Sequence, residues 1–197
     1  MMIVAFGGRA GSGKSTAAKL LQSLFPLKIV VLSFATPVKA IASIIGGSNY
    51  TTKIDKNSKP PTLADTDLTW RRLLQIVGTD FGRNMLHPEI WIRLAERAMD
   101  RELANGKIVV FDDLRFENEL RFIKQRGGHT VFVDRNLPAM DHPSERLDFV
   151  ELFDRTILNT GSLTDLQAAI VELAFDLRII SMAGGAYQIE MPLAFPS

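Results

Sequence analysis

The octapeptide Gly8-Arg9-Ala10-Gly11-Ser12-Gly13-Lys14-Ser15 reads G-x-x-x-x-G-K-S. Residues 2–6 precede it as a short apolar run, which is typical of a buried strand. Residues 16–24 follow it with apolar side chains at helical spacing. A phosphate-binding P-loop requires this strand–loop–helix context, and we therefore predict a P-loop here.

The glycines of the octapeptide explain why such a loop can bind an anion. They admit backbone conformations closed to other residues, so consecutive N–H groups can face one concavity. The helix that follows adds the positive end of its dipole. Lys14 is then expected to neutralise the β- and γ-phosphates of a nucleoside triphosphate, and the Ser15 hydroxyl to bind Mg²⁺. The residues predicted to contact the donor nucleotide are Gly8, Arg9, Ala10, Gly11, Ser12, Gly13, Lys14, Ser15 and Thr16.

Composition limits the classes of protein to which the chain can belong. Its 197 residues suffice for one α/β domain with a sizeable core. Lys and Arg number 23 and Asp and Glu 22, a net charge of +1 that argues against a dedicated nucleic-acid-binding protein. The absence of cysteine excludes disulfides, thiolate zinc sites and cysteine chemistry. No apolar run is long enough to cross a membrane and no secretion signal is visible, so we expect a cytoplasmic protein without membrane partners.

Four further runs are typical of buried strands and alternate with helical segments. They are residues 28–34, 107–113, 129–134 and 155–159. The alternation predicts an α/β fold of the P-loop NTPase class: a five-stranded parallel sheet flanked by helices, with the P-loop strand in its centre. We expect a single domain over residues 1–197, with an inserted region at about residues 35–90.

The inserted region has three parts that differ in pattern. Residues 46–69 are polar with little periodicity, which fits either a surface loop or a segment that covers a substrate. Residues 70–77 are expected to form a short helix that ends at Gly78, followed by a polar turn at residues 79–83. Trp91, in the helix after that, is by default a core residue.

A P-loop indicates a nucleotide but not a reaction. A GTPase would carry an Asn-Lys-x-Asp segment after a strand, and the sequence has none. The third strand ends in Asp112 and Asp113, where an acid can meet Mg²⁺ or an arginine. Arginines also lie near the expected ends of strands: Arg71 or Arg72, Arg83, Arg115 and Arg135. Transfer between two anionic phosphates requires such cations, so the pattern favours a kinase whose acceptor is itself a phosphate.

Several segments beyond the P-loop carry a family resemblance. They are Leu32–Lys39, Arg71–Arg83 together with Trp91, Asp113–Glu119, His142–Glu145 and Ile157–Leu163. In this order, and over residues 3 to about 175, the chain resembles the phage- and prophage-type deoxynucleoside monophosphate kinases of the P-loop nucleoside monophosphate kinase superfamily. The resemblance implies phosphorylation of deoxynucleoside 5′-monophosphates to diphosphates, with ATP as donor and Mg²⁺ as cofactor. The host cytoplasm would be the location if a phage encodes the protein.

The resemblance also implies residue roles. Lys14 and Arg115 would act on the transferring group, and Asp113 would orient Mg²⁺ through water, with Asp112 as a less favoured substitute. Arg135 would act from a lid at about residues 135–146. The acceptor pocket would be formed by Ser33, Phe34, Lys39, Arg71, Gln75, Thr79, Asp80, Arg83, Trp91, Arg115, His142 and Glu145.

Two residues near the acceptor helix need separate mention. Arg71 matches the phosphate ligand of the family's Arg-x-x-x-Gln helix, so Arg72 is the expected surface residue. Trp70 departs from the small residue or proline that the family often has there, so the entry to this helix is expected to differ.

The sequence leaves other readings open. A different small-molecule P-loop kinase, similar to dephospho-coenzyme A kinase, and a non-catalytic ATP-binding protein both remain alternatives. The base that is read and the preference for deoxyribose over ribose are not determined. The predicted partners are ATP and a deoxynucleoside monophosphate, without nucleic acid. The apolar tail, residues 182–195, leaves a homodimer open.

Overall fold

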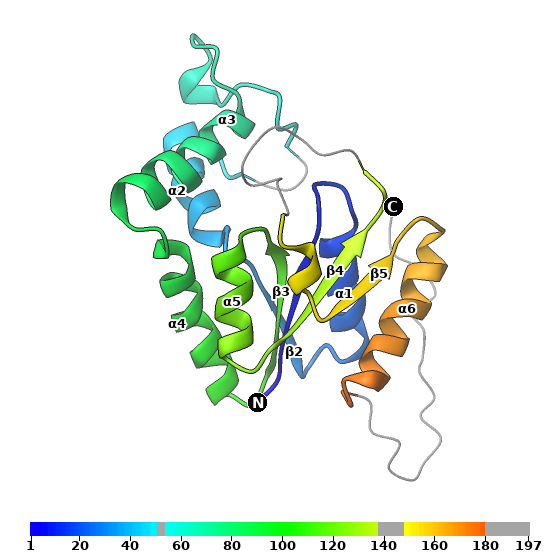
Figure 1. Ribbon diagram of the computed structural model, residues 1–197. Coiled ribbons are helices and arrows are strands. Elements are labelled where there is room, and N and C mark those ends of the chain that lie inside the picture. Colours follow the sequence, from blue (N-terminus) through cyan, green and yellow to red (C-terminus); the bar gives the residue numbers. More distant parts are fainter. Residues whose placement is uncertain (51–53, 138–147, 180–197) are drawn as a thin grey trace. The chain divides into compact units, whose positions relative to one another are not determined.

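The computed structural model describes residues 1–50, 54–137 and 148–179, in which five parallel strands form one sheet (Figure 1). The strand order is β2-β3-β1-β4-β5. The strands are β1 (Ile3–Gly7), β2 (Ile29–Leu32), β3 (Ile108–Leu114), β4 (His129–Asp134) and β5 (Arg155–Leu158). The P-loop strand β1 therefore lies in the centre, and the predicted α/β P-loop fold is confirmed.

Helices connect these strands, and the chain divides into two compact units. The helices are α1 (Lys14–Leu24), α2 (Thr36–Gly46), η1 (Pro61–Leu63), α3 (Trp70–Gln75), η2 (Ile76–Leu86), α4 (Ile90–Ala104), α5 (Glu117–Gln125), η4 (Val150–Leu152) and α6 (Leu163–Asp176). The first unit comprises Met1–Val31 and Arg101–Ser197, and the second is Leu32–Asp100. None of the helices within the described ranges is both long enough and apolar enough to cross a lipid bilayer.

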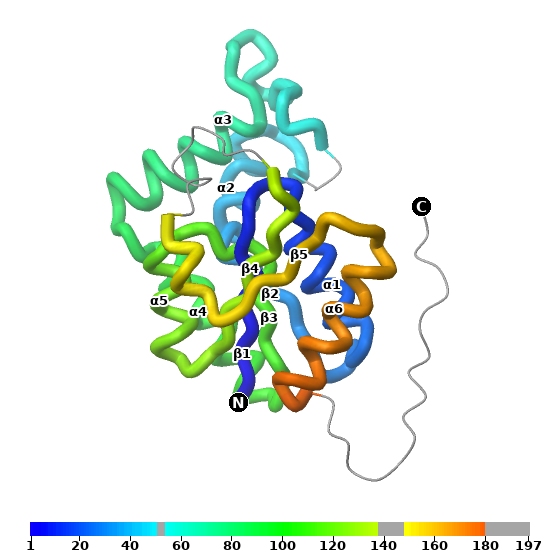
Figure 2. The backbone as a smooth tube through the Cα atoms, turned by 45° about the vertical axis from the view of Figure 1, so that its right-hand side comes forward, coloured from blue at the N-terminus to red at the C-terminus, as the bar shows by residue number. Residues whose placement is uncertain are grey.

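The core of the first unit lies between the sheet and the helices α1 and α6. Val4 and Phe6 of β1 and Val131 and Val133 of β4 alternate along their strands and pack on this side. The two helices lie side by side (Figure 2). Both contribute apolar side chains to this core. Each buried side chain of this size stabilises the fold by about 1.5–3 kcal/mol relative to exposure, so this layer fixes the sheet from which the P-loop emerges.

The second unit has an apolar cluster of its own. Its buried members are Val38, Ala42, Trp70, Leu73, Val77 and Trp91. Trp70 lies against Gly46, where an added Cβ would approach the indole to 2.3 Å, and its ring is 5.3 Å from that of Tyr50. Trp70 therefore begins α3 as a core residue, which accounts for the large side chain at this position.

The polar segment before α3 is held to the helices around it. The Trp70 N–H donates to the Ser58 carbonyl at 3.0 Å, and the Arg71 N–H donates to the Lys56 carbonyl at 2.8 Å. Thr62 donates its hydroxyl hydrogen to the Ile45 carbonyl at the end of α2. Residues 54–69 are therefore tied to α2 and α3 by hydrogen bonds to the backbone, whereas residues 51–53 lie outside the described part of the chain.

The prediction of a helix end at Gly78 and a polar turn at residues 79–83 is wrong. The chain instead continues from α3 into a π-helix, η2, over Ile76–Leu86. The Trp91 indole Nε1–H donates to the Gly78 carbonyl at 2.7 Å. At Gly82 an added Cβ would lie 2.2 Å from the same indole. Both glycines therefore meet a tertiary partner, and this contact outweighs their ordinary tendency to end a helix.

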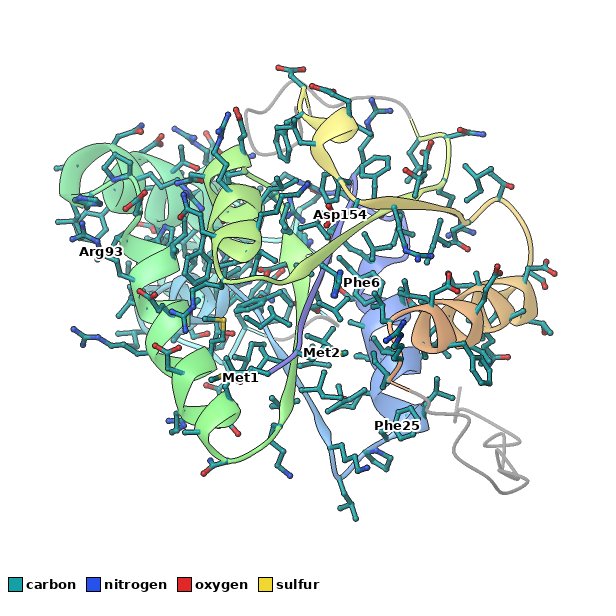
Figure 3. All side chains as sticks on the ribbon, turned by 60° about the horizontal axis from the view of Figure 1, so that its bottom comes forward. Met1, Met2, Phe6, Phe25, Arg93 and Asp154 are labelled. Carbon is teal, nitrogen blue, oxygen red and sulfur yellow. The ribbon has the colours of Figure 1, made fainter. Side chains whose placement is uncertain are left out.

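A polar network joins the starts of β4 and β5 to the end of α5. Asp154, just before β5 (Figure 3), accepts hydrogen bonds from the Thr130 N–H at 2.8 Å and the Thr130 hydroxyl at 2.7 Å. Its other oxygen lies 2.8 Å from the Lys124 ammonium. Burial tends to raise the pKa of Asp154, but the hydrogen bonds from Lys124 and Thr130 outweigh it and lower the pKa below the ordinary value.

We expect Asp154→Asn to destabilise the fold in a pH-dependent way. The unfolded-state pKa is about 3.9, so the network stabilises the protein above that pH and loses its effect as the pH falls through the lower folded-state pKa. Urea unfolding should show a loss of about 1 kcal/mol at pH 7, allowing for solvent exposure of the pair.

The difference from the wild-type protein should shrink near about pH 3. Glu151→Gln, a change at an exposed carboxylate nearby, serves as the control and should have little effect at either pH. An equal loss at both pH values for Asp154→Asn would contradict the assignment.

Candidate functional site

The P-loop has no room for side chains at two of its glycines. Gly8, Gly11 and Gly13 have φ values of 148°, 80° and 100°, the region that favours glycine. A Cβ at Gly8 would lie 2.5 Å from the Val133 carbonyl oxygen, and one at Gly13 would lie 2.3 Å from Asn159 Nδ2. The loop therefore needs glycine for its backbone conformation and for its close approach to β4 and the end of β5.

Polar groups gather inside this loop. The Lys14 side chain is buried, and its Nζ donates to the Arg9 carbonyl at 2.8 Å. Ser12 is 1% exposed, and its hydroxyl oxygen has no hydrogen-bond partner among the described residues. Ser15 and Thr16 are exposed in the first turn of α1. A buried cation, a buried hydroxyl and a helix N-terminus together fit a polyphosphate.

Arg9 links the P-loop to the segment after β4. Its guanidinium Nη1 donates to the Leu137 carbonyl, and Gly11 also faces the Leu137 side chain. Arg135 is exposed, and Asn136 follows it with a φ of 53°. Only the first residues of the expected lid are thus described, because residues 138–147, with His142 and Glu145, lie outside the described ranges.

Asp112 and Asp113 lie at an irregularity of β3, next to the start of the P-loop. Ala5 pairs with Phe111 and Gly7 pairs with Leu114, so the two acids stand opposite one residue of β1. A bulge of this kind breaks the alternation of side chains and can redirect them. The described residues contain no cluster of three or more acids and histidines that could hold a metal by itself. Mg²⁺ commonly takes only one or two carboxylates from a protein, with water and substrate phosphates as its other ligands.

Arg115 follows β3, and Glu119 fixes the backbone around it. The Glu119 carboxylate, 2% exposed, accepts the Arg115 N–H at 2.8 Å and the Phe116 N–H at 3.1 Å. These amides precede α5 and would otherwise lack helical partners. Glu119 therefore orients the turn that carries Arg115.

In the second unit, the expected acceptor residues near β2 lie at the start of α2. Phe34 is buried at 2% exposure, while Ser33 and Lys39 are partly exposed. The Ser33 carbonyl accepts the Thr36 N–H at 3.2 Å, which closes the turn into the helix. Ser33 and Lys39 are therefore partly accessible to solvent, whereas Phe34 is not, and their part in binding the acceptor stays a prediction.

The arginines of α3 and η2 already have polar neighbours. Arg71 Nε donates to Asn57 Oδ1 at 3.4 Å. Arg72 is exposed, as expected of a surface residue, and forms an ion pair with Asp80 at 3.2 Å. Arg83 donates to the Pro88 carbonyl at 3.1 Å. Gln75 ends α3, and Thr79, one turn into η2, is partly exposed.

Two supporting residues were not recognised from the sequence. Glu119 and Asn159 lie inside segments that carried the family resemblance, yet their roles depend on backbone groups met only in the fold. Trp91 was expected by default in the core, and this is confirmed, because it is 3% exposed and its indole donates to the Gly78 carbonyl. Its place beside the acceptor stays a prediction. A sequence signal existed only for Glu119, at the third position of a helix that begins near Phe116.

Comparison with known proteins identifies the family. A family model described as deoxynucleotide monophosphate kinase matches residues 48–170. The chain belongs to the deoxynucleotide monophosphate kinase family. A candidate deoxynucleotide monophosphate kinase of Acanthamoeba polyphaga mimivirus is 31% identical, over 87% of this chain and 95% of the viral protein. The deoxynucleoside-5′-monophosphate kinase of Escherichia phage T5 is 25% identical, over 73% of this chain and 84% of the phage protein.

Membership of the deoxynucleotide monophosphate kinase family makes the protein a phosphotransferase with ATP as its donor. Among solved structures, the APS kinase of Mycobacterium tuberculosis aligns at a TM-score of 0.47 and 15% identity, covering 88% of this chain and 96% of that one. The dephospho-CoA kinase of Campylobacter jejuni aligns at 0.46 and 17% identity, covering 90% and 98%. Neither likeness identifies a substrate.

The contact between Gly82 and Trp91 yields a prediction about the second unit. Gly82→Ala should destabilise the protein by about 1–3 kcal/mol, because the new methyl group would overlap the indole. In a Trp91→Leu background the same change should cost less, since the smaller side chain leaves room. A double-mutant cycle on urea unfolding measures this coupling. An identical cost in both backgrounds would show that the overlap is not the cause.

Proposed function

We propose that the protein transfers the γ-phosphoryl group of ATP to the 5′-phosphate of deoxynucleoside monophosphates, forming diphosphates. The observation that carries this is a complete P-loop, with buried Lys14 and Ser12, in a chain of the deoxynucleotide monophosphate kinase family. The mimivirus and phage T5 relatives bear names of the same activity.

We assign the binding site of the phosphoryl donor, ATP, to the first unit. The loop amides and Lys14 would hold the β- and γ-phosphates, and Arg115 and Arg135 would offset the charge on the transferring group. Mg²⁺, when bound, would neutralise the phosphates and align them for transfer. Ser15 supplies a hydroxyl for it, and Asp113, or Asp112 beside it, would hold its water ligands.

We assign the acceptor to the second unit, Leu32–Asp100, which corresponds to the region expected to be inserted in the domain. Its exposed or partly exposed cations are candidates for the monophosphate, with Arg71 favoured over Arg72 because Arg72 is paired with Asp80. A bidentate arginine suits the phosphate of a nucleotide. Thr79 and Arg83 lie on the neighbouring η2 and would extend the pocket.

The transfer requires no side-chain base. The acceptor phosphate is already anionic near neutral pH, so positioning and charge neutralisation supply the catalysis. The residues assigned above accordingly include cations and hydroxyls, and the two acids are assigned only to the metal.

A substrate panel tests the function. ATP consumption is measured with each deoxynucleoside monophosphate, each ribonucleoside monophosphate and dephospho-coenzyme A. We expect turnover with one or more deoxynucleoside monophosphates and a loss of at least about a hundredfold in Lys14→Ala, which removes the cation at the transferred group. Lys19→Ala, at an exposed position of the same helix α1, serves as the matched control and should retain activity.

The other outcomes separate the alternatives. Turnover confined to dephospho-coenzyme A would support the alternative of a kinase similar to dephospho-coenzyme A kinase. ATP binding without turnover of any acceptor would support a non-catalytic ATP-binding protein. Full activity in folded Lys14→Ala would refute the assignment of the donor site.

The roles of Asp112 and Asp113 can be separated by how far the loss of each carboxylate changes the Mg²⁺ requirement of the enzyme. We expect Asp113→Asn to raise the Mg²⁺ concentration for half-maximal activity by about tenfold or more, the size typical of outer-sphere metal contacts. Asp112→Asn, at the neighbouring position of the same bulge, is the matched comparison and should have the smaller effect. The reverse order would assign the metal to Asp112, and small effects of both changes would remove both acids from the metal site.

A further inference from the structure

Asn159 is the first residue after β5, and it is held on two sides. Its backbone N–H donates to the Asp134 carbonyl at 2.6 Å, which continues the pairing of β4 with β5. Its side chain is buried, at 8% exposure for the residue. The side-chain Nδ2 donates to the Ser12 carbonyl at 2.8 Å. The end of β5 thus presents a fixed hydrogen-bond donor to the backbone of the P-loop.

The contact acts on one peptide group of the loop. In a trans peptide the C=O and the following N–H lie in one plane and point in opposite directions. The hydrogen bond that holds the Ser12 carbonyl toward Asn159 therefore turns the Gly13 N–H away from Asn159. Gly13 has a φ of 100° and no Cβ, so this peptide could otherwise rotate with little steric resistance.

The orientation matters because a phosphate and a carbonyl oxygen repel each other. An anion-binding loop needs successive N–H groups directed into the concavity. If the peptide between Ser12 and Gly13 rotated, it would present its carbonyl oxygen in place of an N–H. A donor on the outer side of the loop prevents this only if it is rigid, and a buried side chain on the sheet edge meets that condition.

We propose that Asn159 is a positioning residue for ATP binding: it locks the Ser12–Gly13 peptide so that the Gly13 N–H faces the polyphosphate. This inference rests on the proposed function of the P-loop as the ATP site. The close packing supports it, because any side chain at Gly13 would collide with the Asn159 amide at 2.3 Å. Asparagine suits the position because its amide donates, whereas an ionised aspartate of the same shape could only accept.

Two variants of the full chain test the proposal. The dissociation constant of ATP with Mg²⁺ is measured by titration calorimetry without an acceptor. Asn159→Ala removes the donor and should weaken ATP binding about fivefold to tenfold, the range expected for one buried hydrogen bond. Asn159→Asp keeps the shape but places an anion against the Ser12 carbonyl, and it should weaken binding by more than about tenfold. The KM of the deoxynucleoside monophosphate should stay unchanged in both.

Asn105→Ala, an exposed asparagine after α4, serves as the control and should bind ATP like the wild-type protein. Circular dichroism establishes that each variant is folded, and if Asn159→Ala unfolds, the isosteric Asn159→Asp carries the test. A lower melting temperature with an ATP dissociation constant within about twofold of wild type would overturn the proposal, since a merely structural role would leave affinity unchanged. If the wild-type protein binds ATP but turns over no acceptor, the proposed function is refuted. The comparison of ATP dissociation constants between the variants and the wild-type protein would still test the role of Asn159.

Discussion

The close approach of the P-loop to the carboxyl ends of β4 and β5 is the constraint on which the rest of the site depends. Gly8 lies against the Val133 carbonyl and Gly13 against the Asn159 amide, with no room for a methyl group at either point. The loop is therefore positioned by the sheet and not only by its own turn conformations. The layer of α1 and α6 under the sheet stabilises the strands that set these distances.

The remaining donor-side groups are held in the same manner, by short contacts to backbone. Glu119 binds the amides that flank Arg115, and the bulge in β3 brings two acids to the start of the loop. Such contacts limit the number of conformations that each charged group can adopt before a ligand arrives. Less reorganisation is then needed when the nucleotide binds, which is how a site gains electrostatic stabilisation.

The parts predicted well from the sequence are those set by local pattern. The P-loop, the five strands and the central place of β1 follow from a motif and from hydrophobic periodicity. The π-helix η2 was missed because its course depends on Trp91, a partner from the next helix. The hydrogen bonds of Glu119 and Asn159 were missed for a related reason. The backbone groups that these side chains bind come close to them only in the folded chain.

The bond between Lys14 and the Arg9 carbonyl has a consequence for the entropy of ligand binding. An ammonium group has three hydrogens to donate, and this bond uses one of them, so an incoming anion need not displace the Arg9 oxygen. The bond restrains a long side chain before a ligand arrives. Fewer side-chain rotamers are then lost on binding, and more of the attraction between the cation and a phosphate remains as affinity.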